Sequence, residues 1–142
     1  AYVRKIKDMA EGDARILLAG FVQGRVMEVL MANCSIYVLP SDVEGMSISL
    51  LEALSYGVRC LVSDIEENVD TAAGYAACFS RGNISLLQKS LEELLKQEEG
   101  VHDSAGQIEF VRGNYNWDLS VKKLLNVYED VIKKESQGDA AQ

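Results

Sequence analysis

Four short apolar runs, separated by segments with helical spacing, constrain the fold of this chain more than any other feature. The first three runs are apolar at consecutive positions, which is typical of strands buried between two layers of helices. Strands that alternate with helices predict an α/β fold, a Rossmann-like parallel sheet of about four strands with helices on both faces. The predicted strands are residues 15–19, 35–39, 59–63 and 76–79.

Apolar residues at helical spacing occupy the segments between and after these runs. Gly57 is expected to end the third helix, because glycine readily leaves the helical conformation. A doubly wound domain usually opens with a strand, whereas this chain opens with a helix. We therefore expect one domain over residues 1–135 that lacks its first strand-helix-strand, followed by a frayed tail of residues 136–142. The predicted helices are residues 1–11, 24–33, 48–56, 84–97, 103–113 and 118–134.

Length and charge narrow the class of protein. A chain of 142 residues can bury the core of one domain. The net charge is −8, with acidic residues spread over the helices, so we expect no nucleic-acid partner. No apolar run approaches the roughly 18 to 20 residues that span a bilayer, and no signal peptide is evident. These features favour a cytoplasmic protein without a transmembrane segment.

The cysteines and the histidine argue against a metal site. Cys34, Cys60 and Cys78 are odd in number and lie in apolar or strand-like contexts. Buried thiols in a reducing compartment are the favoured interpretation. His102 is the only histidine and lies far from every cysteine in the sequence, so we expect a solvent-facing helix residue and no zinc site.

The loop after the second run is the most informative stretch. Ser47 is a suitable N-cap for a helix that begins at Ile48, because its hydroxyl can accept a hydrogen bond from an amide in the first turn. Gly45 allows the backbone either to approach a ligand closely or to adopt positive φ. The loop therefore presents free amides and the positive end of a helix dipole at the carboxyl edge of the sheet, where phosphates bind in open α/β folds.

Two carboxylates, Glu44 and Glu52, flank this predicted anion site. Carboxylates repel a diphosphate, but each can accept several hydrogen bonds from vicinal hydroxyl groups such as those of ribose or a hexose. The alternative is that Glu44 is solvated and Glu52 forms an ion pair with a lysine or arginine. Spacing alone does not decide between the two.

The surrounding residues resemble a known family. Glu44 and Glu52 stand in the frame Leu-Pro-Ser-x-x-Glu-Gly-x-x-x-x-Leu-Leu-Glu-Ala-x-x-x-Gly, which resembles the signature of the group 1 retaining glycosyltransferases of GT-B architecture. The resemblance identifies the chain as the C-terminal, donor-binding domain of such an enzyme, truncated at its amino end. Further similar stretches are residues 16–22, 32–41, 59–65 and 115–118.

The resemblance implies a function and a set of roles. The enzyme would transfer a sugar from a nucleotide-diphosphate-sugar donor to an acceptor with retention of configuration, with no metal and no cofactor. Glu44 would contact hydroxyls of the transferred sugar and Glu52 the ribose diol. The Ser variant of the loop is similar to that of enzymes using UDP-sugars. The backbone of Gly45, Met46, Ser47 and Ile48 would hold the distal phosphate, and Gly20, Phe21 and Val22 would contact the base.

The chain also departs from the family pattern. The basic residues that bind the phosphates, together with the first strand-helix-strand, are expected before Ala1, and the N-terminal acceptor domain is missing. We therefore expect this chain alone to be inactive, and expect membrane docking, if any, to be peripheral and to depend on the absent half. Without the missing strands, residues 15–19 are expected to pair with residues 35–39, or a partner chain to fill the gap in a homo-oligomer.

Several alternatives remain. The chain could be a non-catalytic nucleotide-sugar-binding module or belong to another GT-B enzyme, such as a nucleotide-sugar epimerase or a phosphorylase. Asp42 and Asp64 could suggest a phosphate-receiver domain, which is disfavoured because no lysine stands at the corresponding position. Residues 64–68 either line the site or form a solvated loop. Tyr115 and Trp117 are expected to pack the last helix onto the sheet, and the charged helices at 89–99 and 122–135 to form solvated faces with i,i+4 pairs.

Overall fold

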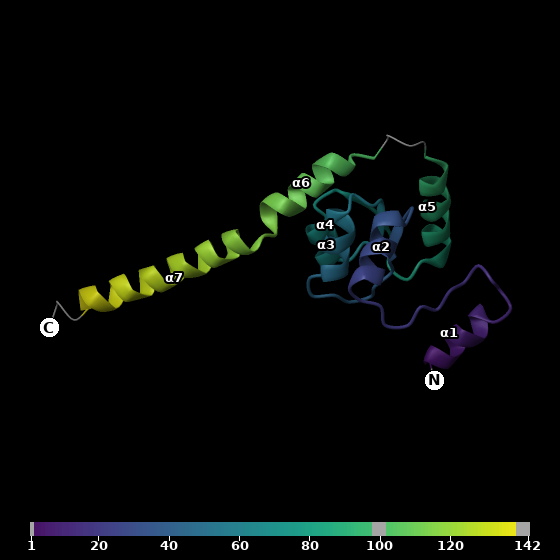
Figure 1. Cartoon of the computed structure of the whole chain (residues 1–142), viewed down its shortest axis with the longest axis horizontal. Coiled ribbons are helices and arrows are strands. Elements are labelled where there is room, and N and C mark those ends of the chain that lie inside the picture. Colours follow the sequence, from purple (N-terminus) through teal and green to yellow (C-terminus); the bar gives the residue numbers. More distant parts are fainter. Residues whose placement is uncertain (1, 98–101, 139–142) are drawn as a thin grey trace. The chain divides into compact units, whose positions relative to one another are not determined.

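The computed structural model describes residues 2–97 and 102–138 (Figure 1). The chain divides into two compact units. The first unit is Ala1–Asn33 and the second is Cys34–Gln142. None of the described helices is long and apolar enough to cross a bilayer.

The first unit contains two helices and no strand among its described residues. Helix α1 (Tyr2–Ala10) and helix α2 (Arg25–Asn33) are joined by a segment without regular structure. The prediction of a strand at residues 15–19, and of its pairing with 35–39, is therefore wrong. A strand needs a neighbour for its backbone groups, and this unit supplies none. An apolar pocket of about 210 Å³ forms instead, lined by Ile6, Met9, Ala10, Ile16 and Leu18.

The second unit is built on a three-stranded parallel sheet in the order β1-β2-β3. The strands are β1 (Tyr37–Leu39), β2 (Cys60–Ser63) and β3 (Ala76–Phe79). In register, Val38 lies beside Leu61 and Leu61 beside Ala77. All four residues of β2 are buried, as expected for the central strand of a sheet with both faces covered. Three of the four predicted strands, and the Rossmann-like α/β class, are confirmed.

Helices cover both faces of this sheet. Successive strand residues point to opposite faces, so Leu61 and Val62 enter different layers. On one face, Leu61 and Phe79 pack with Leu94 of helix α5 (Ile84–Lys96). On the other, helix α3 (Ile48–Ser55) buries four apolar residues: Leu50, Leu51, Ala53 and Leu54.

Helix α4 (Glu66–Ala72) was not predicted. Of the two possibilities for residues 64–68, the solvated loop is wrong because residues 66–68 are helical, whereas residues 64–67 line a pocket at the carboxyl edge of the sheet. It is only seven residues long and has no side-chain N-cap, so its pattern is too short for periodicity to reveal. Glu66 and Glu67 stand in its first turn, where the helix dipole favours acidic side chains. The helix places the side chain of Asn68 fully inside the protein.

Helix α6 (Ser104–Asn114) is fastened to the end of α3. Gln107, fully buried, donates from Nε2 to the carbonyl oxygens of Leu54 (3.1 Å) and Val58 (2.9 Å). Gly57 ends α3 at φ +70°, as predicted, and a Cβ there would lie 2.9 Å from the Cβ of Ser104. The close approach of α6 therefore depends on a glycine at this position.

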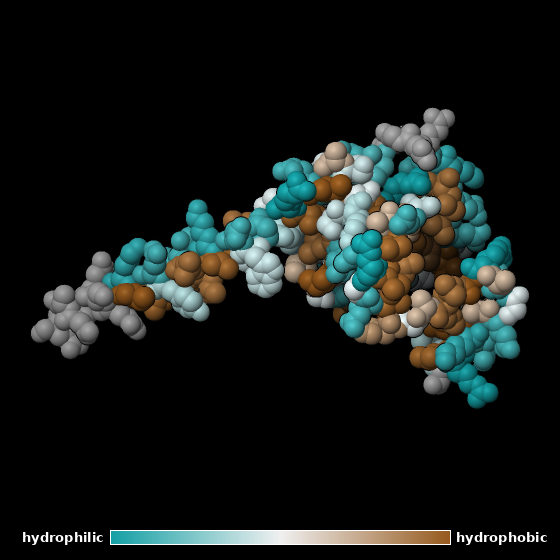
Figure 2. All heavy atoms as spheres, viewed as in Figure 1, coloured by the Kyte–Doolittle hydropathy of each residue, from teal (hydrophilic) through white to brown (hydrophobic). Residues whose placement is uncertain are grey.

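Helix α7 (Trp117–Gly138) differs from the expectation of a packed last helix. None of its described side chains is buried, and Trp117 is 85% exposed. Tyr115 contacts Phe110 edge-on, with ring centroids 5.9 Å apart. The packing role expected for Trp117 is wrong, and apolar surface is visible along the helix (Figure 2). Residues 136–138 are helical, and residues 139–142 of the predicted tail lie outside the described residues.

The remaining expectations concern charges and thiols. The i,i+4 pairs Lys89–Glu93 (3.9 Å) and Glu129–Lys133 (3.7 Å) confirm the solvated charged faces. Of the three cysteines only Cys60 is buried; Cys34 is half-buried and Cys78 is exposed. Burial, aided by the nearby Cys34, raises the pKa of Cys60 to about 12.

Candidate functional site

The three strands end at one edge of the sheet, and the loops that follow them enclose a pocket. Because the strands are parallel, their carboxyl ends meet at this edge, where open α/β folds bind ligands. The pocket has a volume of about 470 Å³ and draws its lining from the loops after β1, β2 and β3. The lining residues are Asp42, Val43, Asp64, Ile65, Glu66, Glu67, Ser80 and Arg81.

The amino end of α3 lies at the same edge and has the predicted cap. Ser47 is buried, has extended backbone angles, and accepts a hydrogen bond from the amide of Leu50 at 3.3 Å. Among the described residues, no acceptor contacts the amides of residues 46–49. Four N–H groups at a helix start form an anion-binding arrangement.

Gly45 leaves open space in front of this helix end. A Cβ at Gly45 would meet no heavy atom within 4 Å, and φ is not positive there. Of the two expected roles of this glycine, the positive φ is therefore wrong, while the backbone is open to the approach of a ligand.

Glu44 and Glu52 lie on the two sides of these amides along the chain, and they differ in environment. Glu44 is half-buried, and its Oε1 accepts a hydrogen bond from the Ser41 hydroxyl at 2.6 Å. Glu52, in α3, is exposed, and the structure gives it no ion pair with a described residue. The described residues therefore do not support the alternative in which Glu52 forms an ion pair with a lysine or arginine.

A tyrosine that the sequence analysis missed joins this group. The Tyr37 hydroxyl lies 2.7 Å from Oγ of Ser49, which lies 3.2 Å from Oγ of Ser47. Burial raises the pKa of Tyr37, and the negative charges of Glu44 and Glu52 act in the same direction. Both carboxylates are therefore close enough to act on one phenol. The only signal in the sequence was a tyrosine within an otherwise aliphatic strand.

Arg81, also missed, is the basic residue of this edge. Its amide donates to Oδ1 of Asp64 at 2.8 Å, and its Nη1 donates to the carbonyl oxygen of Asp42 at 3.3 Å. It therefore links the loops that follow all three strands. Its position two residues after the third strand was the signal that could have found it.

The residues expected near the base belong to the first unit. Gly20 has φ +69°, a conformation that favours glycine. Phe21 is 90% exposed and Val22 is half-buried. Their side chains are thus available to a ligand on the first unit.

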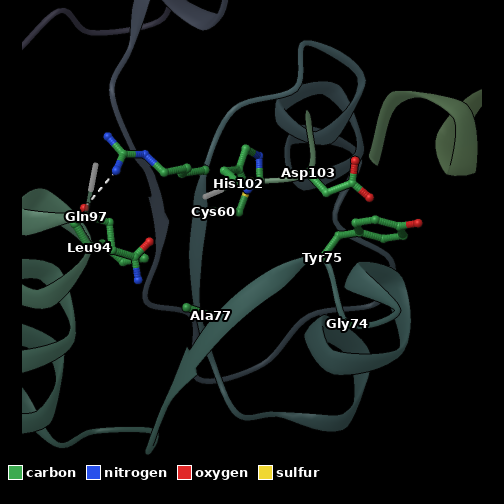
Figure 3. A pocket seen from close by; sticks show the side chains of 9 residues that line it. Cys60, Gly74, Tyr75, Ala77, Leu94, Gln97, His102 and Asp103 are labelled. Carbon is green, nitrogen blue, oxygen red and sulfur yellow. Dashed lines mark hydrogen bonds between the residues drawn. The ribbon is translucent and has the colours of Figure 1, made fainter. Parts of the chain in front are cut away.

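A second pocket, of about 400 Å³, lies at the opposite, amino edge of the sheet (Figure 3). His102 lines it together with Cys60, Tyr75 and Asp103. This corrects the expectation for His102, which precedes α6, is half-buried, and has no hydrogen-bond partner at its buried Nε2 among the described residues. Across residues 2–97 and 102–138, no cluster of His, Cys, Asp and Glu could hold a metal ion.

Comparison with known proteins identifies the family of this chain. The family model "Glycosyl transferases group 1" matches residues 2–109. The chain is 31% identical over 106 residues to the N,N'-diacetylbacillosaminyl-diphospho-undecaprenol alpha-1,3-N-acetylgalactosaminyltransferase of Campylobacter jejuni, which covers 73% of this chain. It is 29% identical over 112 residues, which are 75% of this chain, to the Bacillus subtilis protein named "Putative glycosyltransferase EpsF". The chain spans 28% of the length of each relative. It belongs to the group 1 glycosyl transferase family.

Proposed function

We propose that this chain is the donor-binding part of a glycosyltransferase that takes a sugar from a nucleotide-diphosphate-sugar and transfers it with retention of configuration. The observation that carries the proposal is the amino end of α3, where the amides of residues 46–49 have no acceptor among the described residues. Two carboxylates flank them, Glu44 before the helix and Glu52 within it. An anion site between two acceptors of hydroxyl groups suits a diphosphate that carries a sugar at each end.

Each group then has a distinct role. The amides from Gly45 to Ile48 bind the distal phosphate, and the helix dipole stabilises the charge that develops on the leaving diphosphate. Glu44, whose carboxylate is fixed by Ser41, accepts hydrogen bonds from hydroxyls of the transferred sugar. Glu52, which is exposed and forms no ion pair with a described residue, accepts hydrogen bonds from the ribose diol. Gly20, Phe21 and Val22 contact the base.

The donor we propose is a UDP-sugar, on the likeness of the serine-containing loop to that of enzymes using such donors. The name of the Campylobacter relative specifies transfer of N-acetylgalactosamine. UDP-N-acetylgalactosamine is therefore the first donor to test, with UDP-glucose as the comparison.

We propose that the complete enzyme also contains regions that correspond to the part of its relatives that this chain does not span. That part would supply the acceptor domain, the basic residues for the phosphates and the missing strands of the sheet. The chain alone should therefore bind a donor weakly and transfer no sugar. Its three cysteines suit a reducing, cytoplasmic compartment, with any membrane contact peripheral.

Calorimetric titration tests this proposal. UDP, GDP and ADP, each with and without an attached sugar, are titrated into the chain and into a longer protein that also contains the upstream strands. We expect one nucleotide to bind to the longer protein at least about tenfold more tightly than the others, which is about 1.4 kcal/mol of binding free energy. If the longer protein binds none of the six ligands, the proposal is contradicted.

A further inference from the structure

We propose that Asn68, Ser63 and Ser41 form a hydrogen-bond relay that positions the carboxylate of Glu44. The three are positioning residues, because they act on a bound sugar only through Glu44. The inference rests on the proposed function for the role of Glu44 in sugar binding. The contacts themselves belong to the protein without ligand.

The relay consists of three consecutive hydrogen bonds. Nδ2 of Asn68 donates to Oγ of Ser63 at 3.0 Å. Oγ of Ser63 donates to the carbonyl oxygen of Ser41 at 2.5 Å, and Oγ of Ser41 donates to Oε1 of Glu44 at 2.6 Å. The relay thus runs from α4, through the end of β2, to the loop that follows β1.

The direction of each hydrogen bond is fixed by chemistry. The carbonyl oxygen of Ser41 can only accept, so the single hydroxyl hydrogen of Ser63 points toward it. Oγ of Ser63 must then accept from Asn68. Nδ2 of Asn68 also lies 3.3 Å from the carbonyl oxygen of Ser63, a second group that can only accept. Only the NH₂ end of the amide can face both oxygens.

The cost that Asn68 imposes argues that its amide is retained for this purpose. Asn68 is fully buried, and its Oδ1 has no hydrogen-bond partner among the described residues. A buried polar atom without a partner destabilises a fold, and an apolar side chain of similar size would avoid that cost. What the amide provides is the two bonds to Ser63, which fix the start of the relay.

The relay also accounts for the difference between the two carboxylates of the motif. Glu44 lies on a loop, where a side chain has more freedom than on a helix, yet it is half-buried and hydrogen-bonded. Glu52 is carried by α3 itself and shows no such support. A loop carboxylate that must meet a sugar hydroxyl in one geometry needs a fixed second layer of contacts.

A test without ligand examines the relay alone. The ¹³Cδ resonance of the Glu44 carboxyl is recorded by NMR in the chain and in Ser41→Ala, Ser63→Ala and Asn68→Asp. We expect all three to move this resonance. Ser41→Thr, which keeps the hydroxyl, should restore it, and Ser120→Ala should leave it unchanged. Ser120 is the matched control, since its hydroxyl also donates to a backbone carbonyl, that of Asn116 at 3.1 Å.

A role limited to stability would give a different result. If Ser63→Ala and Asn68→Asp lower the thermal midpoint but leave the Glu44 resonance at its original position, the relay is wrong. Should Asn68→Asp fail to fold, Ser63→Ala alone decides, because it removes one oxygen atom and introduces no charge.

A second test, in the longer protein, links the relay to sugar binding. The ratio of the affinities for UDP-N-acetylgalactosamine and UDP isolates the contribution of the sugar. We expect Ser63→Ala to reduce this ratio about five- to tenfold, as one lost hydrogen bond would, with UDP affinity unchanged. Adding Ser63→Ala to Glu44→Ala should cause no further loss.

The two tests distinguish a failure of the proposed donor-binding function from a failure of the relay. If the unaltered protein binds no nucleotide-sugar, the proposed function is wrong, and the ¹³Cδ resonance still decides whether the relay holds Glu44. If the unaltered protein binds the donor but Ser63→Ala keeps the full ratio, the relay has no part in sugar binding and the inference is overturned.

Discussion

Glu44 and Glu52 belong to one motif but are held in different ways, so their substitution should have different effects. Glu44 is half-buried with a hydrogen bond from Ser41, whereas Glu52 is exposed on α3. The family resemblance predicts that Glu44 contacts sugar hydroxyls and that Glu52 contacts the ribose diol.

Substituting each carboxylate by alanine tests these roles in the full-length enzyme. Glu52→Ala should weaken UDP binding about tenfold, since a charge-assisted hydrogen bond contributes about 1.5 kcal/mol or more. Glu44→Ala should leave UDP binding unchanged and mainly reduce turnover. Calorimetry and initial rates measure the two effects, with Glu93→Ala on the exposed face of α5 as the control. Equal and negligible effects of both substitutions would show that these carboxylates are only surface charges.

Gly57 should be essential to packing as well as to backbone conformation. In Gly57→Ala the new Cβ would lie 2.9 Å from Cβ of Ser104 and 3.1 Å from Cδ1 of Ile108. Gly82→Ala is the matched control, because Gly82 has φ +73°, close to the +70° of Gly57, but open space around it. We expect both to destabilise the fold by about 1 kcal/mol through strain, and Gly57→Ala by a further 1 to 3 kcal/mol through overpacking. Equal losses in chemical denaturation would contradict the close packing of α6.

The buried thiol of Cys60 should react more slowly than the exposed thiol of Cys78. Burial raises the pKa of Cys60 to about 12 from an ordinary value of 9.0, and Cys78, although its pKa is also raised, is exposed. A disulfide reagent at pH 8 should therefore modify Cys78 first and Cys60 only on unfolding, with Cys78→Ser used to assign the reaction. Equal rates at both thiols in the folded protein would contradict the assignment of Cys60 to the core.

The same shift predicts the direction of a pH effect on stability. The folded state holds the Cys60 proton more tightly than the unfolded chain, so the stability it contributes is complete below pH 9 and is lost as the pH rises toward 12. The free energy of unfolding should fall over this range, and less steeply in Cys60→Ala. An identical slope in that variant would show that other groups cause the fall.

At the scale of elements, α3 and its cap were predictable and α4 was not. Ser47 caps a helix at Ile48 because a short polar side chain precedes an apolar run, a local signal. Residues 15–19 have an equally strong local pattern but form no strand, because a strand depends on a neighbour that the pattern does not contain. Helix α4 is too short to show periodicity. The relay through Asn68 could not be predicted either, because its middle hydrogen bond joins Ser63 to Ser41, which are 22 residues apart in the sequence.

Gln107 should control the attachment of α6. Its Nε2 donates, inside the protein, to the carbonyl oxygen of Leu54 in the last turn of α3 and to that of Val58, which follows this helix. Gln107→Ala should destabilise the second unit by about 2 to 3 kcal/mol and increase amide exchange in α6. Gln88→Ala, which removes an exposed bond to Glu92 on α5, is the control and should change stability by less than about 0.5 kcal/mol. Unchanged exchange in α6 would contradict this attachment.

At the scale of the whole molecule, the family is established, but the chain spans only 28% of the length of each relative. The sheet has three strands in its described part, and β1 lies at one edge of it. We still predict that a further strand, from a longer chain or from a second copy, pairs with this sheet. Light scattering after size exclusion is recorded for the 142-residue chain and for a longer protein. If a second copy supplies the strand, the 142-residue chain should be a dimer; if the longer chain supplies it, the longer protein should be a monomer. A stable monomer of the 142-residue chain, with three strands only and with donor affinity equal to that of the longer protein, would contradict the prediction.

The most direct test of the central claim is to map the donor site by NMR. UDP-N-acetylgalactosamine is added to the ¹⁵N-labelled longer protein, and the amide resonances of both edges of the sheet are followed. The account predicts that the largest shifts fall on the amides of residues 45–49 and on the residues around Glu44 and Glu52. Shifts confined to the pocket at the amino edge, around His102 and Tyr75, with the amides of residues 45–49 unmoved, would contradict it.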